Sequence, residues 1–194
     1  MHMTLGKFDT AIENLVVLIA DRNSYTRRLT RAMLARAKAI YEVGDGAATL
    51  QAIRSVNPDV MILDWNLPGL NGREVMRIVR QPNTFPRANL PIIMLMDVGE
   101  HAHVHEAMQL GVHEVLVKPI SPKVLQERLL GILVKPRPMV WIDKCYVPQP
   151  RRLGEMREAA GTPDAGAPDA DAADAEVADA EAADVVDERI AATG

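Results

Sequence analysis

The sequence contains few of the residues and segments that mark membrane, secreted or disulfide-stabilised proteins. Its 194 residues include one cysteine, Cys145, so no disulfide can form within the chain. Aromatic residues make up only 4% of a composition that is 48% hydrophobic, which predicts an aliphatic core. No apolar run approaches the roughly 18 residues of a membrane span, and residues 1–13 lack the apolar segment of a secretory signal. We therefore expect one domain, or two small ones, located in the cytoplasm.

Charge is unevenly distributed along the chain. Residues 161–194 contain ten acids and one arginine, a net charge of −9, whereas residues 1–160 contain 21 basic and 16 acidic residues, a net charge of +5. The acidic segment has no aromatic residue and consists mainly of Ala, Asp, Glu and Pro, so we predict a disordered tail over residues 157–194. Residues 136–194 lack the apolar pattern and the basic charge of a DNA-binding domain.

Five apolar runs alternate with five helical patterns between residues 13 and 134. The strands are predicted at residues 14–20, 39–43, 60–64, 91–96 and 112–117, and the helices at residues 25–38, 47–55, 72–80, 100–110 and 121–134. Strands that are apolar on both faces are typical of parallel sheets covered by helices on each side. The sequence therefore predicts an α/β, doubly wound fold. Residues 1–12 are interpreted as an extension, and residues 135–156 as an arm or linker.

Three ionisable residues fall at the ends of predicted strands: Asp21, Asp64 and Lys118. The carboxyl ends of parallel strands share one edge of a sheet, so these three side chains can converge there. Two neighbouring carboxylates favour Mg²⁺, and a lysine opposite them can hold an anion. This chemistry suits transfer of a phosphoryl group to Asp64. An Asx turn at the strand end explains Asp64 alone equally well.

Several motifs at these positions resemble a known family. They are Val17–Asp21, the segment from Asp64 to Gly72 with its Leu67-Pro68-x-x-x-Gly72 pattern, Pro91–Leu95, Gly111 and Val117-Lys118-Pro119. Together they resemble the receiver domains of bacterial two-component response regulators, of the chemotaxis-regulator type, over residues 13–134. The resemblance implies a flavodoxin-like sheet of five strands in the order 2-1-3-4-5 with five helices.

The resemblance also implies a function in phosphorelay signalling rather than enzymatic activity. Asp64 would be the phosphoacceptor, Lys118 would contact the phosphoryl group, and the backbone carbonyl of Asn66 would join Asp21 and Asp64 as ligands of Mg²⁺. The implied partners are a sensor histidine kinase or phosphotransfer protein and a downstream protein. Pairing of two copies through the fourth and fifth helices is also implied, with the apolar residues Val124, Leu125, Leu129 and Ile132 as candidates for that surface.

Three residues depart from the receiver pattern. Arg22 stands where a second acid is usual, so we predict weak binding of Mg²⁺ and a guanidinium that pairs with Asp21 or Asp64. Met96 stands where a Ser or Thr hydroxyl would reach the phosphoryl group, and Val115 stands where a Tyr or Phe ring would turn inward. The usual pair of switch residues is therefore absent.

Two rival interpretations remain. The first is a pseudo-receiver, a protein-interaction module that acts without phosphorylation. The second is a flavodoxin-like enzyme or nucleotide-binding protein, which is disfavoured because no Gly-rich loop follows the first strand. The crowded histidines His101, His103, His105 and His113 could suggest a metal site, but a solvated or pH-sensitive surface is favoured. The basic side of the first helix is interpreted as a solvated face, with a docking face as the alternative.

Overall fold

Five parallel strands form the centre of the protein, in a computed structural model that describes residues 12–81, 87–142 and 145–149. The sheet order is β2-β1-β3-β4-β5, which confirms the predicted fold. The strands are β1 Val16–Ala20, β2 Ala39–Val43, β3 Val60–Asp64, β4 Ile92–Met96 and β5 Glu114–Val117. The proposed extension at residues 1–12, apart from its last residue, and the acidic tail lie outside the described residues.

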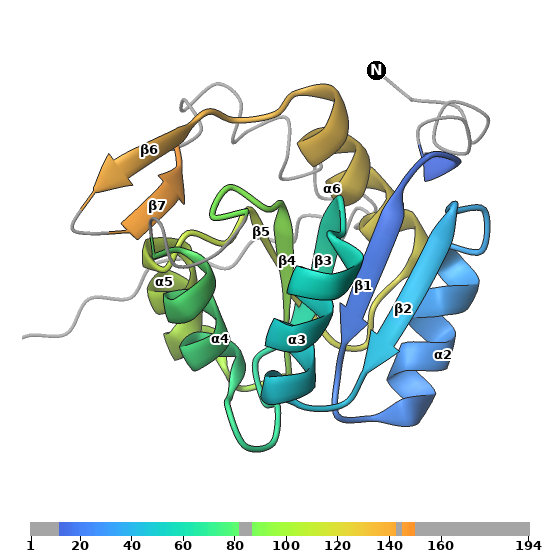
Figure 1. Cartoon of the computed structure of the whole chain (residues 1–194). Coiled ribbons are helices and arrows are strands. Elements are labelled where there is room, and N and C mark those ends of the chain that lie inside the picture. The colour runs from blue at the N-terminus through green and yellow to red at the C-terminus, as the bar shows by residue number, and fades with distance from the viewer. Residues whose placement is uncertain (1–11, 82–86, 143–144, 150–194) are drawn as a thin grey trace, which may run out of the picture. The chain divides into compact units, whose positions relative to one another are not determined.

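Helices cover both faces of this sheet. They are α2 Ser24–Met33, α3 Gly46–Val56, α4 Gly72–Val79, α5 His101–Gln109 and α6 Pro122–Val134. Helices α3, α4 and α5 lie on one face, and α2 and α6 lie on the other (Figure 1). Alternate side chains of each central strand enter the two resulting cores, and every residue of β3 and β4 is buried. None of the helices in the described residues has the length and hydrophobicity that crossing a bilayer requires.

Short polar residues start helices in the loops that follow the strands. The side chain of Asn23 accepts a hydrogen bond from Tyr25 N at 2.9 Å and caps α2. Asn71 caps α4 in a reciprocal arrangement with Glu74, at 3.0 and 2.9 Å. Such caps satisfy amide groups that have no partner within the helix. They also fix each helix start beside the carboxyl edge of the sheet, where the predicted site lies.

Two segments differ from the predictions. Helix α2 ends at Met33 rather than near residue 38. Two segments of the region interpreted as an arm or linker pair as antiparallel strands, β6 Met139–Ile142 and β7 Cys145–Pro148, and are called the hairpin below. The hairpin packs on the domain, where Tyr146 N donates to Arg80 O at 3.4 Å. Gly111 allows this approach, because a Cβ there would lie 2.3 Å from Tyr146 O.

A buried polar cluster lies beside this hairpin. The guanidinium of Arg80 is completely buried and donates to Gly111 O at 3.1 and 2.9 Å and to Ala88 O at 2.7 Å. His113 is buried nearby and accepts a hydrogen bond from Ile92 N at 3.2 Å. Burial, together with the charges of Arg80 and Arg137, lowers the pKa of His113 to about 3. His113 is therefore a neutral part of the core at pH 7.

Candidate functional site

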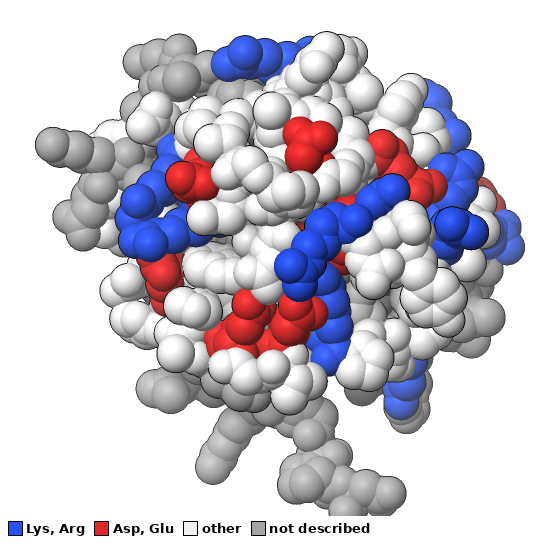
Figure 2. Space-filling view, turned by 90° about the horizontal axis from the view of Figure 1, so that it is seen from below, with Lys and Arg blue, Asp and Glu red and all other residues white. Residues whose placement is uncertain are grey.

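The three residues predicted to converge meet at the carboxyl edge of the sheet. Asp21 follows β1, Asp64 ends β3 and Lys118 follows β5, and both aspartates are completely buried. The ammonium nitrogen of Lys118 lies 2.9 Å from Asp21 Oδ2 and 2.8 Å from Asp64 Oδ1. Basic and acidic side chains lie side by side near the middle of this face (Figure 2). One lysine therefore pairs with two buried carboxylates and balances only one of their two negative charges.

Burial and charge control the protonation of this cluster. The pKa of Asp64 is raised, mainly by burial and also by the nearby charge of Asp21, against the lowering effect of Lys118. Burial alone would lower the pKa of Lys118, but its close contacts with the Asp64 and Asp21 carboxylates outweigh burial and raise that pKa. Lysine therefore stays charged at neutral pH.

One carboxylate oxygen at the centre of the cluster remains free. Asp64 Oδ2 is buried and has no hydrogen-bond partner among the described residues. Asp21 Oδ2 is close to Lys118 but out of line for a hydrogen bond. Leaving a buried oxygen of this kind without a partner costs free energy, and it is the type of atom that binds a hard cation.

The donor set at this edge fits a magnesium ion. Mg²⁺ is usually bound by one or two carboxylates and keeps several waters. Asp21 and Asp64 supply the carboxylates, and the free oxygen of Asp64 is the structural observation that supports the fit. The described residues contain no group of three or more His, Cys, Asp or Glu side chains that could hold a metal. Metal binding here would therefore also depend on water and on a backbone carbonyl such as that of Asn66.

The prediction that Arg22 pairs with Asp21 or Asp64 is wrong. Its guanidinium does not pair with Asp21 or Asp64 but lies 3.4 Å from Asp97 Oδ2, and 56% of the Arg22 side chain is exposed. The backbone oxygen of Asp21 instead accepts a hydrogen bond from Arg27, at 2.7 Å. The positive charge at position 22 therefore lies on the rim of the site rather than among the buried acids.

Two further acids at the site were not identified from the sequence. Asp97 Oδ1 lies 3.8 Å from Lys118 Nζ. The side-chain amide of Asn66 donates to Asp97 Oδ2 at 3.2 Å and to Glu100 Oε1 at 2.6 Å. Asp97 follows β4 directly, which is the same signal that identified Asp21 and Asp64. Glu100 carries no comparable sequence signal, because it lies four residues beyond the end of β4.

Comparison with known proteins identifies the family. A family model described as the response regulator receiver domain matches residues 17–130. The chain belongs to this family. Among curated proteins, the receiver domain is 33% identical over 120 residues to chemotaxis protein CheY1 of Helicobacter pylori, covering 60% of this chain and 95% of that protein. It is 32% identical over 115 residues to chemotaxis protein CheY of Pseudomonas aeruginosa, covering 58% of this chain and 91% of that protein.

Solved structures support the same assignment. A putative response regulator from Chloroflexus aurantiacus aligns with a TM-score of 0.58 at 29% identity, covering 63% of this chain and 99% of that chain. The chemotaxis response regulator CheY4 of Vibrio cholerae aligns with a TM-score of 0.56 at 27% identity, covering 62% of this chain and 99% of that chain. The shared part is the receiver domain with its flavodoxin-like sheet.

The two switch positions of this receiver domain are apolar and packed. Met96 ends β4 with 1% of its surface exposed, and its backbone oxygen accepts a hydrogen bond from Lys118 N at 2.8 Å. Val115, on β5, packs against the same core as Met96. Neither side chain carries a hydroxyl or a ring, so neither can make the contacts that the family resemblance implies at these positions.

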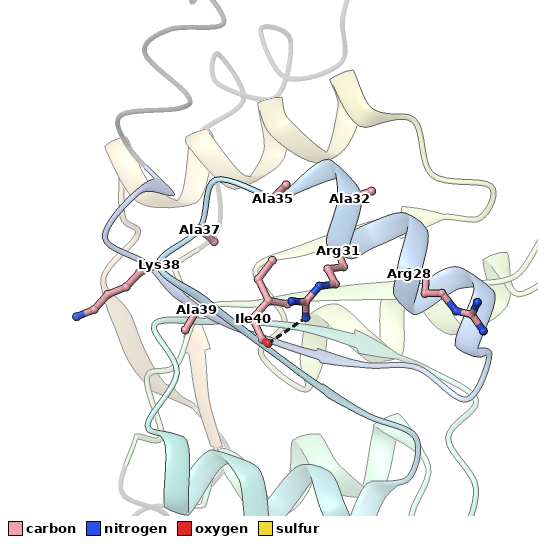
Figure 3. Close-up of a pocket in the computed structure, with 8 residues that line it drawn as sticks. All are labelled: Arg28, Arg31, Ala32, Ala35, Ala37, Lys38, Ala39 and Ile40. Carbon is pink, nitrogen blue, oxygen red and sulfur yellow. Dashed lines mark hydrogen bonds between the residues drawn. The ribbon is translucent and has the colours of Figure 1, made fainter.

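In the part of the chain that the structure describes, the histidines and the basic residues of α2 form no second centre. His103 stacks on Trp65 with ring centroids 5.3 Å apart, whereas His113 is buried in the core. Arg27 and Arg31 both pair with Glu42, at 3.8 and 3.1 Å. A hollow of about 450 Å³ lies at the carboxyl end of α2 (Figure 3). Four alanines line it together with Arg28, Arg31, Lys38 and Ile40.

Proposed function

We propose that this receiver domain accepts a phosphoryl group on Asp64 from a sensor histidine kinase or a phosphotransfer protein and then signals through contacts with a downstream protein. The observation that supports this function best is the Lys118 ammonium held between two buried carboxylates, one of which has a free oxygen. This arrangement provides a carboxylate nucleophile and an ammonium group that can pair with the negative charge of the transferred phosphoryl group.

The residues divide the chemistry between them. An ionised oxygen of Asp64 attacks the phosphorus atom of the donor, the new oxygen–phosphorus bond forms, and the bond to the donor nitrogen breaks with its electron pair staying on that nitrogen. Lys118 moves from the carboxylate to an oxygen of the phosphoryl group. Asp21, Asp64 and the backbone carbonyl of Asn66 would hold Mg²⁺, which neutralises part of the transferred negative charge.

Phosphate-affinity electrophoresis tests this assignment. With acetyl phosphate and Mg²⁺, the wild-type chain should give one retarded band and a mass increase of one phosphoryl group. Asp64→Asn should give neither, because the amide is not a nucleophile of this type. Asp59→Asn is the matched control, since Asp59 lies just before the opposite end of β3 and should leave the band unchanged. A retarded band that persists in Asp64→Asn would move the phosphoacceptor elsewhere. A wild-type chain that stays unmodified but binds a partner would favour the phosphorylation-independent alternative.

Pairing of two copies through α5 and α6 has less support from the structure than the sequence suggested. Of the four apolar residues considered for that surface, Leu125, Leu129 and Ile132 are buried in the core, and only Val124 is exposed, at 38%. Pairing by this face would therefore rely on polar contacts or on α5. Sedimentation before and after phosphorylation measures it, and a monomer in both states would remove dimerisation from the proposed function.

A further inference from the structure

The amide of Asn66 is held between two carboxylates. Its nitrogen lies 2.6 Å from Glu100 Oε1 and 3.2 Å from Asp97 Oδ2. An amide nitrogen has two hydrogens, and ionised carboxylates only accept hydrogen bonds, so both contacts assign the orientation of this amide. Hydrogen bonds to charged acceptors are shorter and stronger than those between neutral groups. Asn66 is therefore fixed by the chain that follows β4.

Glu100 connects this amide with the start of α5. Its second carboxylate oxygen accepts a hydrogen bond from Asp97 N at 2.7 Å, while the residue itself stands at the N-cap position of α5. A negative side chain at the amino end of a helix is favoured by the helix dipole. The Glu100 side chain thus joins the loop after Asp64 to the backbone after β4, and its backbone oxygen accepts a hydrogen bond from His103 N, at 2.9 Å, in the first turn of α5.

Trp65 makes a second connection to the same helix. It follows Asp64 directly, is 8% exposed and stacks on His103 of α5 at an interplanar angle of 21°. Two successive residues after the phosphoacceptor position therefore contact α5. The family's usual route through a hydroxyl and an aromatic ring is closed by Met96 and Val115. A bound group shifts a conformational equilibrium only through contacts that differ between the two states, and the contacts of Trp65 and Asn66 are available for that.

We propose that Glu100 is a positioning residue that holds Asn66 in place and makes α5 respond to the occupancy of the site. Occupancy moves the loop after Asp64, because that loop carries the carbonyl expected to bind the metal. Glu100 and the Trp65–His103 stack transmit this movement to residues 101–109. The surface that a downstream protein recognises would then include α5. This inference rests on the proposed function for its signal, but the connection itself can be measured without phosphorylation.

Hydrogen exchange in the ligand-free protein tests the connection. Glu100→Ala should accelerate exchange in both residues 65–71 and residues 101–109 by about tenfold, the effect expected from losing hydrogen bonds to a charged group. Glu100→Gln, which keeps an acceptor oxygen, should restore part of the protection. Glu127→Ala, an exposed glutamate of α6, is the control and should change neither segment. Unchanged exchange in both segments of Glu100→Ala would overturn the inference, whatever happens at Asp64.

A second measurement asks whether the connection carries the signal. Trp141→Phe leaves Trp65 as the only tryptophan, so its fluorescence reports on the loop. Mg²⁺ with beryllofluoride, a phosphoryl mimic, should change this fluorescence and the exchange of residues 101–109 in the Trp141→Phe chain. In Glu100→Ala the mimic should still bind, at a several-fold higher Mg²⁺ concentration, but hydrogen exchange in residues 101–109 should no longer change on binding. An α5 response of full size in Glu100→Ala would refute the role of Glu100, whereas absence of binding to the Trp141→Phe chain would refute the proposed function instead.

Discussion

Replacement of Lys118 by methionine tests the electrostatic design of the site most directly. The variant keeps most of the side-chain volume and removes the charge. At about 2.8 Å and an effective dielectric constant near 20, the attraction between the ammonium and one carboxylate is about 6 kcal/mol. Part of this attraction offsets the cost of burying the charges, and removing one partner of a buried pair typically costs about 3–5 kcal/mol. We expect a loss of that size in the free energy of unfolding at pH 7, since only 15% of the Lys118 side chain is exposed.

The pH dependence of Lys118→Met gives an independent check. Without the ammonium, the pKa of Asp64 should rise further above its unfolded value of 3.8. The native state then binds a proton at Asp64 more tightly than the unfolded state, so the contribution of Asp64 to stability is greatest at low pH and is lost as the pH rises through the native pKa. Adding Asp64→Asn to Lys118→Met should restore much of the stability at pH 7. Urea denaturation measures both effects. A loss below about 1 kcal/mol, as for exposed ion pairs, or no recovery in the double variant would refute this reasoning.

Two further predictions concern the cluster beside the hairpin. Because of His113, the free energy of unfolding should fall by about 1.4 kcal/mol for each unit that the pH drops between about 6.5 and 3, since the unfolded chain binds a proton there that the native core excludes. In His113→Asn, denaturation at pH 7 and pH 5 should show a smaller change of this free energy with pH. An equal change in the variant and the wild type would contradict the assignment. Gly111→Ala should lower the melting temperature more than Gly99→Ala. Both residues have positive φ, but only a Cβ at position 111 would clash with Tyr146 O. Equal losses of melting temperature in calorimetry would show that the hairpin shifts at little cost.

The sheet was predictable because its signal is local and repeated. Each strand is a short apolar run followed by turn residues, and the limits of β2 and β3 agree with the prediction. The end of α2 was not predictable from its alanine-rich sequence, which favours a longer helix. Leu34 turns into the core between α2 and α6 and is completely buried, and its oxygen accepts a hydrogen bond from Ala37 N at 2.8 Å. Packing therefore overrides propensity at that point.

Within the site, topology predicted which strand ends meet but not which side chains pair. Asp21, Asp64 and Lys118 converge because parallel strands place their carboxyl ends on one edge. The pairing of Arg22 with Asp97 depends on the loop after β4, whose path is set by distant contacts. The hairpin was missed for a similar reason, since it contacts Arg80 and Gly111, which lie far from it in sequence. Non-local contacts of this kind have no periodic signal in the chain.

The positive charge of Arg22 is expected to weaken the binding of Mg²⁺ at the site. Its side chain is 56% exposed, so solvent screens its repulsion of a cation, and about 1 kcal/mol per unit charge at about 4 Å is a suitable magnitude. Arg22→Ala should then tighten Mg²⁺ binding by about fivefold, and Arg22→Asp should tighten it further because a carboxylate is added. Arg28→Asp is the matched control: it makes the same change in charge as Arg22→Asp, at an exposed position within α2. Calorimetric titration with Mg²⁺ measures all three variants. If Arg28→Asp tightens binding as much as Arg22→Asp, only the net charge matters, and the guanidinium on the rim has no specific effect on the metal.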